Sequence, residues 1–255
     1  MHGPDELREL VEERLAAFEP APELSGLEEA VRYALEGGKR VRGVLCLATA
    51  EAAGGSAESA LDAAAALELV HAFSLVHDDL PAMDDDDERR GRASAHVAFG
   101  EAVALLAGDA LLAEALRLVL AYDDPELARE LTHATLGMIG GQFLDITGVD
   151  GDLAALHRLK TGRLLAASVG LGLRAASVPA EEQGPWRAFA DELGLLFQVV
   201  DDLLDGDGYV TRLGSDGTRR LAVDAAERAR ARLTAIPAET SVLEELVEGL
   251  AVRSA

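Results

Sequence analysis

Cysteine, aromatic residues and basic residues are all scarce in this sequence. Its single cysteine, Cys46, cannot form a disulfide within the chain or supply a thiolate cluster, which excludes a disulfide-stapled secreted domain and a cysteine-based zinc site. Lys and Arg number 23 against 46 Asp and Glu, for a net charge of −23. Because so acidic a chain repels phosphates, we expect no nucleic-acid or membrane-surface binding, and cations are the favoured partners.

Long apolar runs are missing as well. No uninterrupted run approaches the roughly 18 apolar residues that argue for a membrane span, and residues 1–6 lack the basic and apolar regions of a signal peptide. We therefore expect a cytoplasmic protein with no membrane span. A chain of 255 residues can bury a sizeable core, and no Gly/Ser-rich or Pro-rich linker divides it. We expect residues 1–255 to form a single domain.

Apolar residues recur every three or four positions in segments of strong helix formers, and this period predicts α-helices. Sustained alternation of apolar and polar residues is not found, so strands have little support. Gly and Pro clusters divide the chain into about ten helices, which predicts an all-α bundle. Segments that are apolar or Ala-rich on most faces should lie centrally; they are 57–80, 95–121, 126–147, 152–175 and 186–205.

Two acidic clusters, in residues 77–88 and 201–207, directly follow apolar helical segments. Their candidate ligands are Asp78, Asp79, Asp84, Asp201, Asp202 and Asp205. Asp201 and Asp205 share a helix face, where like charges repel unless a cation lies between them. A solvated acidic surface is the alternative, but each cluster begins where an apolar helix ends, so we expect both at the mouth of one cavity. Oxygen ligands without His or Cys favour Mg²⁺, which typically bridges to phosphate.

Basic residues gather at three places. Residues 37–42 read Gly-Gly-Lys-Arg-Val-Arg, which puts three cations after a glycine pair that permits close backbone approach. Arg89 and Arg90 follow the first acidic cluster, and Lys160 lies with Thr161 in an otherwise apolar helix. Together with the acidic clusters, these cations predict two bound diphosphates, one held through metal and the other held by cations directly.

These motifs, in this order, resemble the trans-isoprenyl diphosphate synthase family, of the farnesyl and geranylgeranyl diphosphate synthase type, over residues 27–233. The stretches that carry the resemblance are 37–42, 71–91, 108–112, 140–145, 160–162 and 197–205. The resemblance implies an all-α fold around a deep central cavity, a homodimer, and three Mg²⁺ ions at the cavity mouth. It also implies an Mg²⁺-dependent prenyltransferase that condenses isopentenyl diphosphate with dimethylallyl or geranyl diphosphate.

The resemblance assigns roles to individual residues. The six aspartates above would bind the metal, and Asp145 would support them. The allylic diphosphate would be contacted by Arg89, Lys160 and Gln198. Isopentenyl diphosphate would be held by Lys39, Arg42, His71 and Arg90, with Thr161 as a further substrate-binding residue.

Chain length would be set by Phe73 and Ser74, which lie five and four residues before Asp78, about one turn or more deeper on the same helix. In the family a bulky aromatic residue there limits elongation. The resemblance therefore predicts farnesyl diphosphate as the product, with geranylgeranyl diphosphate as the nearest alternative.

The chain departs from the family pattern after Asp205. The family normally continues with Gly-Lys segments whose lysine helps to hold the allylic diphosphate, whereas residues 206–214 lead directly into the next helix. An active enzyme could use Arg212, Arg219 or Arg220 instead or rely on a partner subunit. The chain could also be a noncatalytic or regulatory homologue, or a cyclase. We favour an active synthase because the groups expected to bind isopentenyl diphosphate are present. An EF-hand is disfavoured because residues 84–87 lack its glycine and spacing.

Overall fold

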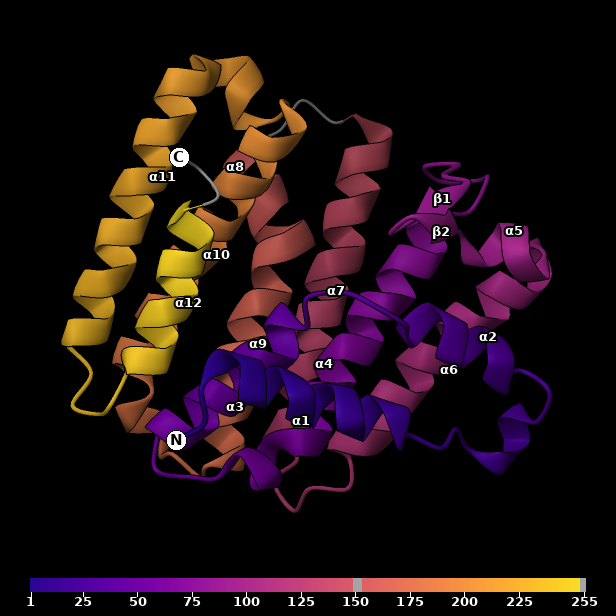
Figure 1. Ribbon diagram of the computed structural model, residues 1–255, viewed down its shortest axis with the longest axis horizontal. Helices are drawn as coiled ribbons and strands as arrows, with labels where there is room; N and C mark the ends of the chain where they lie inside the picture. The colour runs from indigo at the N-terminus through magenta and orange to yellow at the C-terminus, as the bar shows by residue number, and fades with distance from the viewer. Residues whose placement is uncertain (149–152, 253–255) are drawn as a thin grey trace.

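The computed structural model describes residues 1–148 and 153–252, and it confirms the all-α prediction. Figure 1 shows long helices packed side by side, with one small strand pair at the edge of the bundle. The helices are α1 (Pro4–Ala16), α2 (Glu28–Leu35), α3 (Val41–Ala52), α4 (Ala57–Asp78), α5 (Ala95–Phe99), α6 (Glu101–Val119), α7 (Glu126–Thr147), α8 (Leu153–His157), α9 (Arg163–Ala175), α10 (Gly184–Asp205), α11 (Tyr209–Thr234) and α12 (Ser241–Ala251). Short 3₁₀ turns span Pro22–Leu24 and Ala180–Glu182.

Three local features differ from the expected helix pattern. The segment 95–121 is divided into α5 and α6 by Gly100, whose φ of 86° no helix tolerates. A π-helical turn, Arg158–Gly162, joins α8 to α9, while residue 152, where this helix was expected to begin, lies outside the described residues. Strands β1 (Glu88–Arg89) and β2 (Arg92–Ala93) form an antiparallel hairpin that the sequence pattern did not indicate.

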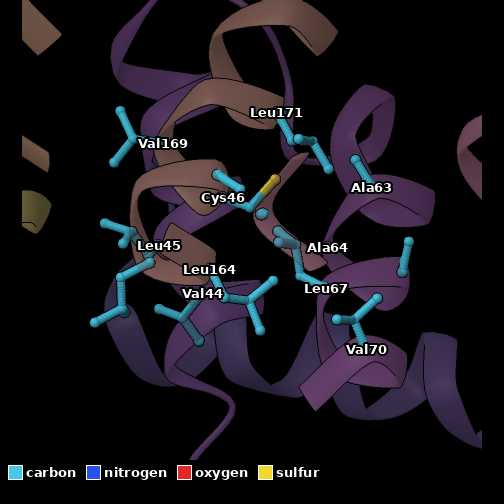
Figure 2. Close-up of a cluster of buried hydrophobic side chains, with 14 of the residues drawn as sticks. Val44, Leu45, Cys46, Ala63, Ala64, Leu67, Val70, Leu164, Val169 and Leu171 are labelled. Carbon is cyan, nitrogen blue, oxygen red and sulfur yellow. The ribbon is translucent and has the colours of Figure 1, made fainter. Parts of the chain in front are cut away.

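The core is built from leucine, valine and many alanines, whose small side chains let the central helices approach closely. Figure 2 shows Cys46 of α3 among Ala63 and Leu67 of α4 and Leu171 of α9. Cys46 is fully buried and burial raises the pKa of its thiol, so it packs as a small apolar residue.

Among the described helices, α4 alone is long and apolar enough on average to cross a membrane. Acidic residues such as Asp62 and Glu68 interrupt it, so it contains no continuous apolar run of that length. In the structure 67% of its most apolar 18-residue window is buried inside the protein. Core helices pass the same test of length and composition, and burial among neighbouring helices accounts for its apolar character here.

The fold brings the ends of distant helices to one side of the bundle. In Figure 1, α4, α7 and α10 all end toward the upper side, although they are far apart in the sequence. Helix α4 ends at Asp78 and α10 ends at Asp205, so each acidic cluster begins where a core helix reaches the surface. The first basic motif, residues 37–42, spans the connection between α2 and α3 and the first two residues of α3.

Candidate active site

A cavity of about 700 Å³ lies between α3, α4, α6, α7, α10 and the π-helical turn. Asp78 from the first acidic cluster and Asp201 from the second both line it, together with the basic side chains of Arg42 and Lys160. Its other walls are largely apolar, with Phe73, Leu112, Met138, Ile139, Phe143 and Phe197 among them. The two acidic clusters therefore contribute to one cavity, as the sequence predicted.

Asp78 and Asp201, two carboxylates that line the cavity, both have raised pKa values. Burial raises the pKa of Asp78 to about 6, with Asp84 and Asp79 adding to the rise and Lys160 opposing it. Burial and the neighbouring aspartates of the second cluster raise the pKa of Asp201. Burial thus disfavours the charged form of both carboxylates more than the nearby cations favour it, and a bound cation would relieve this.

Within residues 1–148 and 153–252, no group of three or more His, Cys, Asp or Glu side chains is close enough to form a metal site. The donor chemistry nevertheless fits Mg²⁺, which commonly binds through one or two carboxylates, several waters and the oxygens of a substrate phosphate. Asp84 and Asp205 are exposed near the two lining aspartates, where they could add ligands.

Asp79 is engaged by an arginine rather than open to the cavity. Its side chain is buried, and Arg89 Nε donates a hydrogen bond to Asp79 Oδ1 at 2.9 Å. A second nitrogen of Arg89 lies 3.1 Å from Asp86 Oδ2. The predicted metal ligand Asp79 and the predicted diphosphate contact Arg89 therefore neutralise each other in this structure.

Asp202 also faces protein groups. Its Oδ1 accepts a hydrogen bond from Gln198 Nε2 at 2.7 Å, and its Oδ2 accepts the backbone N–H of Tyr209 at 2.7 Å. Asp202 thus satisfies an amide at the start of α11, and a Cβ on Gly208 would overlap its carboxylate. Gln198 and His157 line a neighbouring pocket of about 360 Å³ rather than the main cavity. The structure does not bring Gln198 to the other predicted catalytic residues.

The cationic side of the cavity is formed by Arg42, with Arg90 and Lys39 near it. Arg42 is 5.9 Å from the centre of the Phe197 ring, and its Nε is buried without a hydrogen-bond partner in the described structure. Burial and the surrounding arginines hold the pKa of His71 well below its ordinary value, so its imidazole is neutral at pH 7. A neutral imidazole can still donate one hydrogen bond to a phosphate oxygen.

The glycine pair before the basic motif has a specific steric reason. Gly38 has a φ of 102°, and a Cβ there would lie 2.9 Å from the guanidinium carbon of Arg90. Arg90 Nη1 donates to the carbonyl oxygen of Gly37 at 2.9 Å and to that of Glu36 at 3.3 Å. The glycines therefore let Arg90 lie against the backbone next to Lys39, which is exposed.

Lys160 and Thr161 lie on the π-helical turn, and both line the cavity. Such turns are rare and frequently occur at functional sites. A Cβ on Gly141 would lie 2.5 Å from the backbone nitrogen of Lys160, so this glycine lets α7 approach the turn closely. The ammonium group of Lys160 forms an ion pair with Asp145, the residue expected to support the metal side.

Gln142 was not singled out from the sequence, although it lies within the motif at 140–145. It lines the cavity at 9% exposure, and both its amide oxygen and its amide nitrogen are buried without a partner in the described structure. Unpaired buried polar atoms are costly, so this side chain fits a ligand or water in the cavity. Its position two residues after Gly140 in that motif was the available signal.

Phe73 and Ser74, the predicted chain-length residues, both line the cavity. Phe73 is buried, and its ring packs edge-on against His77 with centroids 5.0 Å apart. His77 is fixed in turn by a 3.0 Å hydrogen bond between its Nε2 and the carbonyl oxygen of Leu105. Phe73 is therefore a rigid part of the wall, about 7.5 Å along the helix axis from Asp78 by the rise per residue.

The described part of the chain is thus a helical bundle in which aspartates and cations share an apolar cavity. The family model for polyprenyl synthetase matches residues 25–218, and the chain belongs to this family.

Relatives and solved structures agree with this membership. The chain is 40% identical over 225 residues to a geranylgeranyl diphosphate synthase of Cyanophora paradoxa, covering 82% of this chain and 75% of that protein. It is 39% identical over 204 residues to a farnesyl diphosphate synthase of Geobacillus stearothermophilus, covering 74% and 69%. A geranyltransferase structure from Legionella pneumophila superposes with a TM-score of 0.85 at 32% identity, covering 98% of this chain and 96% of that one.

Proposed function

We propose that this protein catalyses the Mg²⁺-dependent condensation of isopentenyl diphosphate with dimethylallyl or geranyl diphosphate. The observation that carries the proposal is the shared cavity: Asp78 and Asp201 lie on it with Arg42 and Lys160, next to apolar walls. The product we propose is farnesyl diphosphate, with geranylgeranyl diphosphate as the alternative. Relatives named for each of these two activities support either chain length.

In the proposed reaction, the carbon–oxygen bond of the allylic diphosphate breaks, and the double bond of isopentenyl diphosphate attacks the resulting allylic cation. A proton is then lost to the departing diphosphate, which leaves a prenyl diphosphate five carbons longer. Asp78 and Asp201 would hold Mg²⁺, with three ions proposed in all, and the metal would stabilise negative charge on the leaving group. Lys160 supplies positive charge at the same place, and the apolar wall around Phe73 keeps water from the cation.

The other diphosphate would be bound by cations directly. Arg42 reaches the cavity with an unpaired Nε, Lys39 lies on the adjoining loop, and Arg90 of the β1–β2 turn donates a hydrogen bond to that loop. Arg89 is paired with Asp79 here, so binding of the allylic diphosphate would require this arginine to exchange a carboxylate for a phosphate. That exchange would free Asp79 as a metal ligand.

Arg212 is our candidate for the cation that replaces the missing lysine. It lies in the first turn of α11, before the break at Gly214, and the start of this turn is tied to the second acidic cluster through Asp202. Arg219 lies beyond that break and is 3.8 Å from Asp216 Oδ1. Of Arg212, Arg219 and Arg220, Arg212 is thus the closest along the chain to the second acidic cluster.

We also propose that the protein is a homodimer that works in the cytoplasm. Four exposed apolar residues follow one face of α7, namely Leu136, Ile139, Phe143 and Ile146. Three of them also line the cavity, so a second copy packed on this face would close its side wall. Sedimentation analysis of a Phe143→Asp variant tests the dimer, which should dissociate into monomers.

The activity is tested by incubation with labelled isopentenyl diphosphate, Mg²⁺ and each allylic primer, followed by chain-length analysis of the products. We expect farnesyl diphosphate, no product with EDTA, and restoration by added Mg²⁺. Phe73→Ala should shift the distribution to longer products, because it removes the ring from the cavity wall. Absence of any condensation with all primers would refute the proposed function, and an unchanged distribution in Phe73→Ala would refute the assignment of chain length.

A further inference from the structure

Arg40 lies in the middle of the basic motif, yet its side chain is directed into the protein. It is 4% exposed, and its backbone is left-handed with a φ of 52° immediately before α3. Its guanidinium is bound in two places by Glu12 of α1, with Nε to Oε1 at 2.9 Å and Nη2 to Oε2 at 3.1 Å. It also donates to the carbonyl oxygen of Leu35 at the end of α2.

Glu68 of α4 completes this anchoring. It is 3% exposed, and its Oε1 accepts the backbone N–H of Gly43 in the first turn of α3 at 2.8 Å. Its Oε2 is 3.9 Å from Arg40 Nη1. Arg40 is therefore held by groups from α1, α2 and α4, and the start of α3 is tied to α4 by the same carboxylate. In Figure 1, α1 crosses the bundle next to α3 and α4.

The anchoring counters a strong repulsion among cations. Arg90 has its pKa lowered by burial and by Arg40, while Glu68 and Glu12 oppose this shift. Arg42 has its pKa lowered by burial, and Glu68 again opposes the shift. Glu12 and Glu68, together with Asp201 beside Arg42, therefore offset part of the positive charge of these arginines.

We propose that Glu12 is a positioning residue for diphosphate binding. Through Arg40 it fixes residues 36–40 in the conformation that presents Lys39, Arg42 and Arg90 to one diphosphate. The assignment of that diphosphate to isopentenyl diphosphate rests on the proposed function, whereas the anchoring itself does not. Glu12 lies outside residues 25–218, which the family model matches, and the sequence motifs do not include it.

Neutralisation of Glu12 should change diphosphate binding in the direction opposite to the one that charge alone predicts. A carboxylate near a cationic site weakens anion binding by its own field, so its neutralisation should strengthen binding if charge alone mattered. If Glu12 instead holds the loop in place, its neutralisation releases Arg40, the loop relaxes, and diphosphate binding weakens.

The test compares Glu12→Gln with Glu13→Gln, which makes the same change of charge at the next, exposed residue of α1. Inorganic diphosphate is titrated into each variant by calorimetry in EDTA, so that no metal contributes to binding. We expect about tenfold weaker binding in Glu12→Gln, and binding within about twofold of wild type in Glu13→Gln. Arg40→Lys keeps the charge but loses the two-point contact, and it should weaken binding similarly.

Steady-state kinetics separate positioning from a general loss of structure. Glu12→Gln should raise KM for isopentenyl diphosphate about tenfold while kcat and KM for the allylic substrate change little, although the melting temperature falls because the buried Arg40 loses its charged partner. Diphosphate binding that is unchanged or tighter in Glu12→Gln would overturn the proposal. So would a parallel rise in both KM values. If the protein proves inactive but the titrations separate the two variants, the positioning role stands and the proposed function fails.

Discussion

Replacement of Gly38 by alanine should damage the cationic side of the site in two ways. The φ of 102° at Gly38 is unfavourable for an L-residue, a backbone strain of about 1–3 kcal/mol. The new Cβ would also lie 2.9 Å from Arg90 and displace a guanidinium that donates to Gly37 O at 2.9 Å. A hydrogen bond from a charged group contributes about 1.5–3 kcal/mol, and the lower value applies because Arg90 is exposed. We expect the free energy of unfolding to fall by about 2.5–4.5 kcal/mol.

Urea unfolding measures that loss, and initial rates measure the effect on the site. With saturating allylic diphosphate, KM for isopentenyl diphosphate should rise about tenfold, since 1.4 kcal/mol corresponds to a factor of ten. Gly54→Ala is the matched control, because Gly54 has a φ of 86° and nothing lies within 4 Å of its added Cβ. It should reproduce the backbone strain and leave KM unchanged. If both variants showed the same KM, the steric argument for Arg90 would be wrong.

Three further predictions follow from particular contacts. If Asp201 holds Mg²⁺ as proposed, Asp201→Asn should lower kcat by about 100-fold or more. The free energy of unfolding should stay equal or rise, because burial raises the pKa of this carboxyl, and a stable, fully active variant would contradict the proposal. The pKa of Asp78 is about 6 in the folded protein, above its value in the unfolded chain. Its contribution to stability is therefore present at low pH and lost as the pH rises through 6. In EDTA, Asp78→Asn should have a higher melting temperature than wild type at pH 8, and the difference should narrow toward pH 5. Gly170→Ala should lower the free energy of unfolding by about 1–3 kcal/mol in urea, because its Cβ would overlap the Glu130 carboxylate and displace it from its partly buried ion pairs, whereas Gly184→Ala, with nothing near its Cβ, should be neutral.

The helical architecture was predictable because it depends on local periodicity. The segment predicted as helical from its apolar spacing, 126–147, has the same first and last residues as the observed α7. The break at Gly100, the π-helical turn at Arg158–Gly162 and the hairpin at Glu88–Arg89 were not predictable in this way. Each involves only a few residues. The π-helical turn packs closely against Gly141, and the hairpin is bound by Tyr33 and Glu36, so both depend on segments distant in the sequence.

The candidate site was predictable to the extent that residue type and helix ends determine it. Asp78 ends the apolar helix α4 and Asp201 lies in the last turns of α10, and both line the cavity as expected. The directions of Asp202 and Arg40 were not predictable, because each side chain also binds a group that lies outside its own motif. Asp202 turns to an amide seven residues further on, and Arg40 turns to Glu12, which is 28 residues away.

The most direct test of the account is the position of the metal relative to the two acidic clusters. Crystals grown with inorganic diphosphate and Mn²⁺, which takes oxygen ligands as Mg²⁺ does, would reveal the ions by anomalous scattering. We predict ions coordinated by Asp78 on one side of the cavity and Asp201 on the other, with diphosphate oxygens between them. Diphosphate bound in the cavity with no metal at either aspartate would contradict the account.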